Sequence, residues 1–455
     1  MRGTSIVTGL CVIGLGLFTL ASSAQAALED ILYEKGLITK DEWVRSKAES
    51  EKAVEEEHQK RDTAIEEEHK KVEKALEEEH KKIDQEFPIS LRYKDGFDLQ
   101  TRDGKFEMQI QGRLQLRYSY DQEGDGFKPQ DSTVFDDKDV SSFRVRRARI
   151  KIGGHGYWPW LKYYAEYDWV SNTMLDYRLD IAKFKWATLR VGQWKIDYNR
   201  ERVDSSGAQQ FVDRSIVNNS FTLDRQIGVR LGGHLFEGTP GYFVYNIGVF
   251  TGSGINQTHN DDKHMLYLGR IQWNFLGRDV PFSQSDVDYS ELPIGSIAFA
   301  GAHNITDRFR FPTDSRASTV DGVSVVDGRF EINQGVQEFA FKWKGLSIQE
   351  EFHVKKVIDR SRSTDGTSYG AYAQVGYFPH AVLEIIPRPL EFAYRYAFVD
   401  PEGLLGHDML REHTVAANWF FAGHRNKLTV DYSHLTREGA FTPIDRVRLQ
   451  WDVSF

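Results

Sequence analysis

The chain has 455 residues, a formal net charge of −9 and a single cysteine, Cys11. One cysteine excludes a disulfide scaffold and a cysteine-based zinc site, and a mean hydropathy of −0.51 excludes a bundle of transmembrane helices. The acidic balance argues against nucleic acid as a partner, because nucleic-acid binding needs a cationic surface.

The first 26 residues have the three parts of a secretory signal peptide. Arg2 supplies the positive charge, residues 6–20 form an apolar stretch, and Ala24-Gln25-Ala26 is a small-residue cleavage site. A retained anchor is the alternative, although the apolar stretch is short for a spanning helix. We therefore expect a mature chain without cysteine in the envelope of a Gram-negative bacterium.

Residues 27–88 are predicted to form a helical coiled-coil stalk. Thr39 and Glu42 form a T-x-x-E capping box, and Phe87-Pro88 ends the helix. Between them the sequence repeats every 11 residues, as AVEEEHQKRDT, AIEEEHKKVEK and ALEEEHKKIDQ. This period favours a right-handed supercoil. The apolar stripe of the helix is narrow, which predicts that the helix associates with other copies of itself.

Each repeat places one histidine beside the apolar stripe: His58, His69 and His80. A metal site or a pH sensor is one interpretation of these side chains. A polar core layer that limits register and oligomeric state is the other. The stalk would lie in the periplasm, where it would hold subunits together or contact the cell wall.

From residue 105 the hydrophobic period changes to two. Residues 106–120 place apolar and polar side chains on opposite parities, which predicts a long strand with one apolar face. The alternation recurs as far as the last residue, Phe455. After a secretory signal, long alternating strands with aromatic ends indicate a transmembrane β-barrel over residues 89–455. An open soluble sandwich, whose strands are usually shorter, is the alternative.

We predict about sixteen antiparallel strands, an even number as in bacterial outer-membrane barrels. Most alternate connections are long, notably 196–223, and the others are tight, which is the usual asymmetry between outer loops and periplasmic turns. The connections 277–291 and 379–388 are longer than a periplasmic turn should be. They leave the strand count open by one hairpin.

A barrel of this size encloses an aqueous channel, so its inward side chains decide the function. The sequence contains no G-x-S-x-G, H-E-x-x-H or Walker motif. We therefore expect a protein that is not an enzyme and that uses neither a cofactor nor a metal.

The second predicted strand carries a basic cluster. Its outward apolar parity switches between Val145 and Ala148, so a β-bulge there would aim both Arg146 and Arg147 into the lumen, with Arg149 and Lys151 continuing the row. Guanidinium groups at close quarters bind anions by charge-assisted hydrogen bonds. The alternative, equally open from the pattern, is that they neutralise the luminal acids Glu166, Asp168, Asp176 and Asp180.

Three stretches resemble the phosphate-selective porin O and P family. They are F-x-x-R-R-A-R-I-K-I-G-G (143–154), LRVGQWKIDYNRERVDSSGAQQFVDRS (189–215) and DRQIGVRLGG (224–233). The likeness runs from about residue 97 to Phe455. It implies a trimeric sixteen-stranded barrel, with segment 196–223 folded inward and a basic anion-binding constriction. Stalk helices before the barrel also occur in this family.

By the same resemblance, the constriction residues are the pair Arg146 and Arg147, together with Arg202 and Arg214 of the inward segment. Arg149 adds a charge where the family often has an aromatic residue, and Gly207 stands where a lysine can occur. Five further arginines are candidates by parity for a luminal basic ladder: Arg113, Arg117, Arg230, Arg270 and Arg395.

We therefore expect a trimeric outer-membrane porin that passes small inorganic anions, phosphate or related oxyanions, by passive diffusion. The alternatives are a general or carbohydrate porin, and an envelope tether in which the stalk carries the function. Residues 27–88 hold 20 acidic and 12 basic side chains, so the barrel domain after them has a net charge of only −2. The acidity belongs mainly to the stalk and does not oppose an anion channel.

Overall fold

The computed structural model describes residues 30–86, 89–122, 139–309, 319–320, 323–324, 326–401, 409–439 and 443–455. The predicted signal peptide, residues 1–26, lies outside these residues. The chain divides into two compact units, Met1–Pro88 and Ile89–Phe455. Within the described ranges, no helix is both long and apolar enough to cross a membrane.

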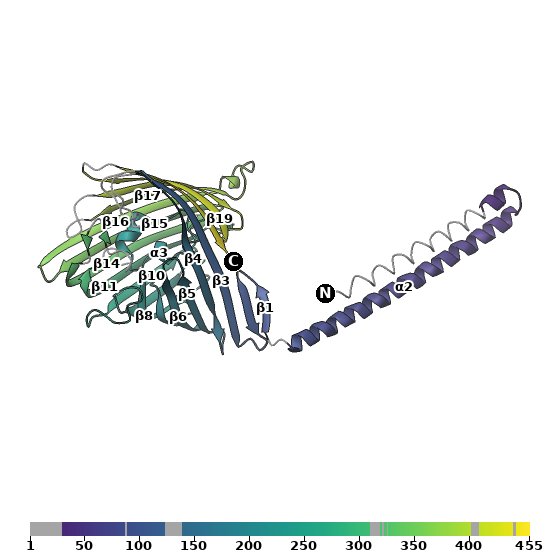
Figure 1. Cartoon of the computed structure of the whole chain (residues 1–455), viewed down its shortest axis with the longest axis horizontal. Coiled ribbons are helices and arrows are strands. Elements are labelled where there is room, and N and C mark those ends of the chain that lie inside the picture. The colour runs from purple at the N-terminus through teal and green to yellow at the C-terminus, as the bar shows by residue number, and fades with distance from the viewer. Residues whose placement is uncertain are drawn as a thin grey trace. The chain divides into compact units, whose positions relative to one another are not determined.

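Helix α2 (Lys40–Glu86) is the long helix of the first unit (Figure 1). The Glu42 carboxylate accepts hydrogen bonds from the Thr39 backbone N–H at 2.9 Å and from the Thr39 hydroxyl at 2.8 Å, so the predicted capping box is confirmed. These hydrogen bonds, the backbone one first, lower the pKa of Glu42 below its ordinary value. Because only the ionised carboxylate accepts these hydrogen bonds, its contribution to helix stability is fully present above the ordinary pKa of a glutamate. This contribution is lost as the pH falls through the lowered pKa of Glu42.

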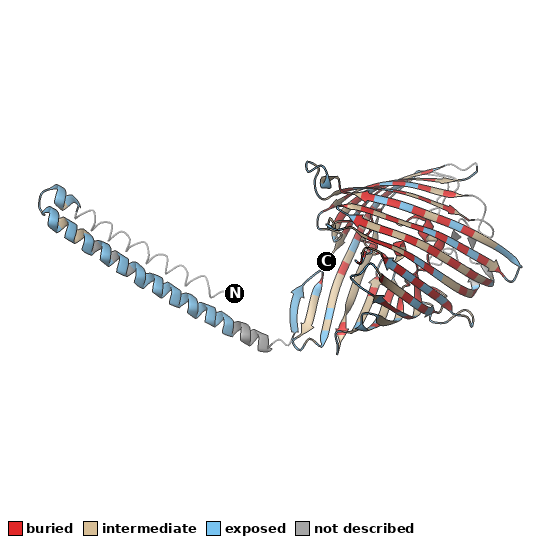
Figure 2. Cartoon of the chain, turned by 180° about the vertical axis from the view of Figure 1, so that it is seen from behind, coloured by how far each residue is buried: buried red, intermediate tan, exposed pale blue. Residues whose placement is uncertain are grey.

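The described side chains of the apolar stripe of α2 are exposed. Ile65, Val72 and Leu76 are 46%, 54% and 50% exposed, and Figure 2 shows the described part of the helix as exposed. The first two repeat histidines are exposed as well, and the side chain of His80 lies outside the described residues. The coiled coil therefore stays a prediction.

The second unit is a closed antiparallel barrel. Neighbouring strands pair in chain order from β3 to β11, β11 pairs with β14, and the order continues to β20. Strand β20 pairs back with β3, which closes the sheet. The predicted count of sixteen strands is confirmed over the described residues. We call the end at which β3 finishes the loop end, and the opposite end the turn end. The barrel strands are β3 (Phe106–Asp121), β4 (Val140–Gly156), β5 (Leu161–Asp168), β6 (Thr173–Phe184), β7 (Ala187–Lys195), β8 (Arg225–Leu235), β9 (Tyr242–Phe250), β10 (Leu266–Asn274), β11 (Ile294–Phe309), β14 (Val326–Trp343), β15 (Leu346–Asp359), β16 (Thr364–Tyr377), β17 (Leu390–Asp400), β18 (Leu410–Phe420), β19 (Asn426–Arg437) and β20 (Ile444–Ser454).

Two short hairpins and a short helical turn were not predicted. Strands β1 (Ile89–Tyr93) and β2 (Phe97–Thr101) pair with each other, and β2 pairs with residues 107–110 of β3, beside the part of β3 that pairs with β20. Strands β12 (Thr319–Val320) and β13 (Val323–Ser324) pair in the connection after β11. The helical turn η1 (Pro379–Ala381) lies in the connection after β16.

Buried and more exposed residues alternate along most barrel strands, as the banding in Figure 2 shows, because successive side chains point inward and outward. On β3, the outward Leu114 and Tyr118 are each 38% exposed, whereas the inward Gln115 and Arg117 are buried. An apolar outer face and a polar inner face are what a bilayer requires of a barrel wall.

Gly154 of the G-G pair explains why that motif needs glycine. Its φ is +151°, and a Cβ at this position would lie 1.9 Å from the backbone oxygen of Glu107 on β3. Any side chain would therefore push β3 and β4 apart at the turn end.

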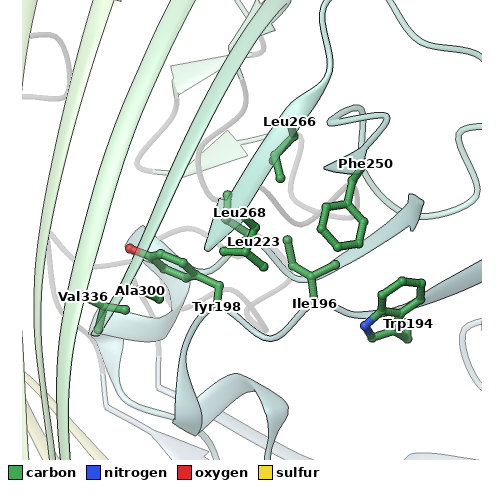
Figure 3. Close-up of a cluster of buried hydrophobic side chains, with 9 residues drawn as sticks. All are labelled: Trp194, Ile196, Tyr198, Leu223, Phe250, Leu266, Leu268, Ala300 and Val336. Atoms are coloured by element: carbon green, nitrogen blue, oxygen red, sulfur yellow. The ribbon is translucent and has the colours of Figure 1, made fainter. Parts of the chain in front are cut away.

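The hydrophobic core of the barrel lies inside the lumen, between the wall and the segment 196–223 that connects β7 to β8. Both stems of this segment contribute to it: Ile196 and Tyr198 at its start, and Leu223 at its end (Figure 3). They pack against inward apolar residues of β9, β10, β11 and β14, namely Phe250, Leu266, Leu268, Ala300 and Val336. Because these wall positions are apolar, covering them stabilises an inward fold of the segment.

Candidate functional site

Segment 196–223 crosses the lumen to the opposite wall. It contains the helices α3 (Arg200–Val203) and α4 (Ile216–Phe221). On α4, Val217 and Phe221 are fully buried in a cluster with side chains of β16 to β20, which include Tyr372 and Leu435. The apolar face of α4 therefore anchors the segment on the far side of the barrel.

Carboxylates of the wall accept hydrogen bonds from the backbone of the segment. Glu351 on β15 accepts from the N–H of Glu201 at 2.5 Å, and Asp431 on β19 accepts from the N–H of Val212 at 3.0 Å. Glu412 on β18 accepts from the first N–H of α4 at 2.9 Å. A buried N–H without a partner costs about 1–3 kcal/mol, so these contacts fix the path of the segment.

Asp213 ties the segment to the seam of the barrel. Its carboxylate accepts from Arg117 on β3 at 2.6 and 3.0 Å, and from Arg448 on β20 at 3.1 Å. Because β3 and β20 are the strands that close the sheet, this carboxylate joins the segment to both of them. The segment is thus held on several sides.

A cavity of about 200 Å³ lies between the segment and the wall near the loop end; we call it the basic cavity. All five predicted constriction residues line it. Its basic lining consists of Arg146, Arg147, Arg149, Lys195, Arg202, Arg214, Arg225, Arg395, Arg446 and Arg448, against only three acidic residues, Asp213, Asp224 and Glu412. Cationic side chains therefore outnumber carboxylates in the lining, and carboxylates outside it pair with several of them, such as Asp431 with Arg448 and Asp176 with Arg225.

The predicted β-bulge on β4 is present. In the pairing of β3 with β4, Leu116 lies opposite Val145 and Gln115 lies opposite Arg147, so Arg146 is the extra residue. Because the bulge resets the parity, two consecutive arginines line the same cavity.

The basic residues of the cavity differ in how they are paired. Arg149 contacts Glu166 at 3.0 Å and Asp168 at 2.9 Å, and Arg202 forms an ion pair with Asp224. The alternative that luminal acids neutralise the arginines therefore holds for Arg149.

Three cations of the cavity have no carboxylate within ion-pair distance among the described residues. Arg147 donates to the Gln115 side-chain oxygen at 2.7 Å. Arg214 and Lys195 both donate to the backbone oxygen of Asp204, at 2.8 and 2.9 Å. Their direct acceptors are therefore neutral carbonyl and amide oxygens, which carry only partial charges.

The five ladder candidates face inward but are not gathered into one row. Arg395 lines the basic cavity, and Arg113 donates to the Ser205 hydroxyl at 2.8 Å. Four of the five are held by acids: Arg117 by Asp213, Arg230 by Asp197 at 3.7 Å, Arg270 by Glu338 at 2.6 Å, and Arg395 by Glu412 at 2.9 Å.

Two further cavities continue from the basic cavity towards the turn end. The middle cavity, of about 260 Å³, shares Arg149, Lys195 and Ser206 with the basic cavity. The exit cavity, of about 560 Å³, shares Arg113 and Lys151 with the middle one. The three cavities therefore follow one another along β3 and β4.

Four basic residues of the cavity were not among the predicted site residues: Lys195, Arg225, Arg446 and Arg448. Arg448 has the polar parity of the last strand, and Arg225 belongs to the DRQIGVRLGG stretch, so both carried a readable signal. Lys195 is the last residue of β7, where parity no longer decides its direction. Only the pairing of β7 with β8 brings it beside Arg225.

A closed sixteen-stranded barrel with an apolar exterior and a polar, cavity-containing lumen defines an outer-membrane porin. The sequence model of the phosphate-selective porin O and P family matches residues 113–448. The chain belongs to the phosphate-selective porin O and P family, and it is an outer-membrane protein of a Gram-negative bacterium.

Individual relatives agree with this assignment. Porin O of Pseudomonas aeruginosa is 29% identical over 315 residues, which cover 64% of this chain and 68% of that protein. The anion-selective porin from Comamonas acidovorans superposes with a TM-score of 0.52 at 9% identity, over 76% of this chain and 99% of that one. The outer-membrane channel DcaP of Acinetobacter baumannii superposes with a TM-score of 0.52 at 12% identity, over 79% of this chain and 99% of that one. At these identities the two structures support the barrel fold alone.

We predict that Phe221→Ala loosens segment 196–223 without opening the barrel. The ring is fully buried against the far wall, and its loss costs about 3–5 kcal/mol of local packing. Single-channel recordings should show more frequent current fluctuations, while the heat-dependent shift in electrophoretic mobility stays that of a folded barrel. Phe299→Ala, which removes an outward ring that is 56% exposed, is the matched control. Equal noise in both variants would contradict this anchoring role.

Proposed function

We propose that the protein is a passive, anion-selective porin, without catalytic activity, whose cargo is phosphate or related oxyanions. The observation that supports this most directly is the set Arg147, Arg214 and Lys195, which line the basic cavity and form no ion pair with a carboxylate of the described residues. The description of the family as phosphate-selective and the name of the Comamonas porin agree with it.

The proposed mechanism is exchange of hydration for protein donors. An anion that enters the basic cavity replaces part of its water shell with guanidinium and ammonium N–H groups, which form charge-assisted hydrogen bonds. Arg147 and Arg214 already donate to neutral oxygens, so a passing anion can compete for these donors and then release them. The middle and exit cavities would receive it along β4.

The reversal potential in a salt gradient tests the proposal. We expect the wild-type channel in a planar bilayer to reverse on the anion side. Arg147→Gln combined with Lys195→Gln should lower the anion/cation permeability ratio by roughly thirtyfold, because each cation attracts an anion about 4 Å away by about 1 kcal/mol even at the dielectric of water, which makes about 2 kcal/mol for the two.

The matched control for this test removes two cations from exposed positions near the loop end. Arg329→Gln combined with Arg360→Gln should leave the permeability ratio unchanged, since both side chains are exposed. A wild-type reversal potential on the cation side would refute anion selectivity, and one near zero would favour a general porin.

We also propose a homotrimer whose helices α2 associate through the apolar stripe as a right-handed coiled coil in the periplasm. What supports this is that a stripe about half exposed in a single chain gains stability only from a partner. Contact with the cell wall is a further role open to the same stalk.

Engineered cysteines test the coiled coil, since Cys11 is the only native cysteine. Val72→Cys places a thiol on the stripe and should give disulfide-linked subunits under mild oxidation. Lys74→Cys, two residues and about 200° further around the helix, should give few. Equal cross-linking at both positions, or none at either, would contradict the association.

A further inference from the structure

The connection between β10 and β11, residues 275–293, is longer than the others at the turn end. Val280 is 1% exposed, and Gln284, Ser285 and Asp286 are 2–3% exposed. A turn that projected into the periplasm would leave such polar side chains in water. Buried polar side chains need fixed partners, and here the connection folds into the barrel to reach them.

The first partners belong to the tip of segment 196–223. The N–H of Gln284 donates to the carbonyl oxygen of Ala208 at 3.0 Å, and the side-chain oxygen of Gln284 accepts from the N–H of Gln210 at 2.8 Å. The Arg200 guanidinium donates to the carbonyl oxygen of Pro281. The connection therefore supports the segment from the turn end, opposite to the basic cavity.

The second set of partners belongs to the wall. Lys342 on β14 donates to the Ser283 hydroxyl at 2.8 Å and to the carbonyl oxygen of Ser285 at 3.0 Å. The Glu391 carboxylate on β17 accepts from the Ser285 hydroxyl at 2.9 Å and from the Gln210 amide at 2.8 Å. Glu391 thus joins the connection, the segment and the wall at one point.

The connection also forms one side of the exit cavity. Pro281, Ser283 and Ser285 line this cavity, while Arg113 and Lys151 line it from β3 and β4. The connection therefore lies against the tip of segment 196–223 and lines the exit cavity, where its Asp286 and Asp288 stand together with Arg113 and Lys151.

We propose that connection 275–293 is a second constriction element. It enters the lumen from the turn end, fixes the tip of segment 196–223 and confines permeating ions to the wall formed by β3 and β4. The identity of these ions rests on the proposed function, whereas the narrowing of the pore does not. Gln284 acts as a positioning residue, because it bonds the segment directly and does not line the basic cavity. Ser285 acts through Glu391, which also accepts from Gln210 of the segment.

The test replaces residues 280–287 of the full chain by the same number of alternating glycine and serine residues. In planar bilayers we expect single-channel conductance in potassium chloride to rise at least about twofold, because pore diameter sets conduction. Current fluctuations should also increase. The reversal potential should keep its sign, since the basic cavity is untouched.

A matched control makes the same replacement at residues 382–386, which lie at the same end. Val382 and Ile385 there are 74% and 92% exposed, so conductance should not change.

If the main variant does not fold, as judged by the heat-dependent shift in mobility, Lys342→Met is measured instead, and its conductance should rise for the same reason. Unchanged conductance in whichever of these variants is folded would overturn the proposal. A wild-type reversal potential on the cation side would overturn anion selectivity and leave the second constriction standing.

Discussion

Every part of the inward face of a sixteen-stranded barrel must either contact water or be covered by protein. In this chain, which parts of the wall are covered by segment 196–223 and which line open cavities determines the rest of the structure. On β9 to β11 and on β14 the inward residues around Leu268 are apolar, and the stems of segment 196–223 cover them. On β15, β18 and β19 the inward residues include carboxylates, which accept N–H groups of the same segment. The segment is thereby held away from β4, along which the cavities run.

Pairing and lack of pairing have different consequences for the basic residues. Buried ion pairs such as Arg149 with Glu166 and Asp168 offset the cost of desolvation and fix side-chain positions, but they add little net potential. Arg147, Arg214 and Lys195 donate to neutral oxygens, and we propose that they exchange these acceptors for an ion in the cavity. A channel needs both kinds, because binding must be favourable enough for entry and weak enough for release.

The sequence predicts the features of this barrel that depend on local pattern. A period of two predicts about sixteen strands, a count that two long connections leave open by one hairpin, and a switch of parity between Val145 and Ala148 is enough to place the bulge. The choice of partner for each charge is not local. Arg149 meets Asp168 through the register of β4 with β5, and the 275–293 connection, which is visible only as an unusual length, folds inward through contacts with β14 and β17. The hairpin β1–β2 is too short for its alternation to be distinguished from a loop.

The central claim is that the basic cavity is where a permeating anion binds. Block of chloride current by added phosphate, measured on single channels, tests it most directly. In Arg146→Ala combined with Arg147→Ala, the phosphate concentration for half-block should rise by at least about tenfold, since a hydrogen bond to a charged group contributes about 1.5–3 kcal/mol. Removal of the exposed pair Arg329 and Arg360 should leave the block as it is in the wild type. An unchanged block in the Arg146 and Arg147 variant would contradict the account.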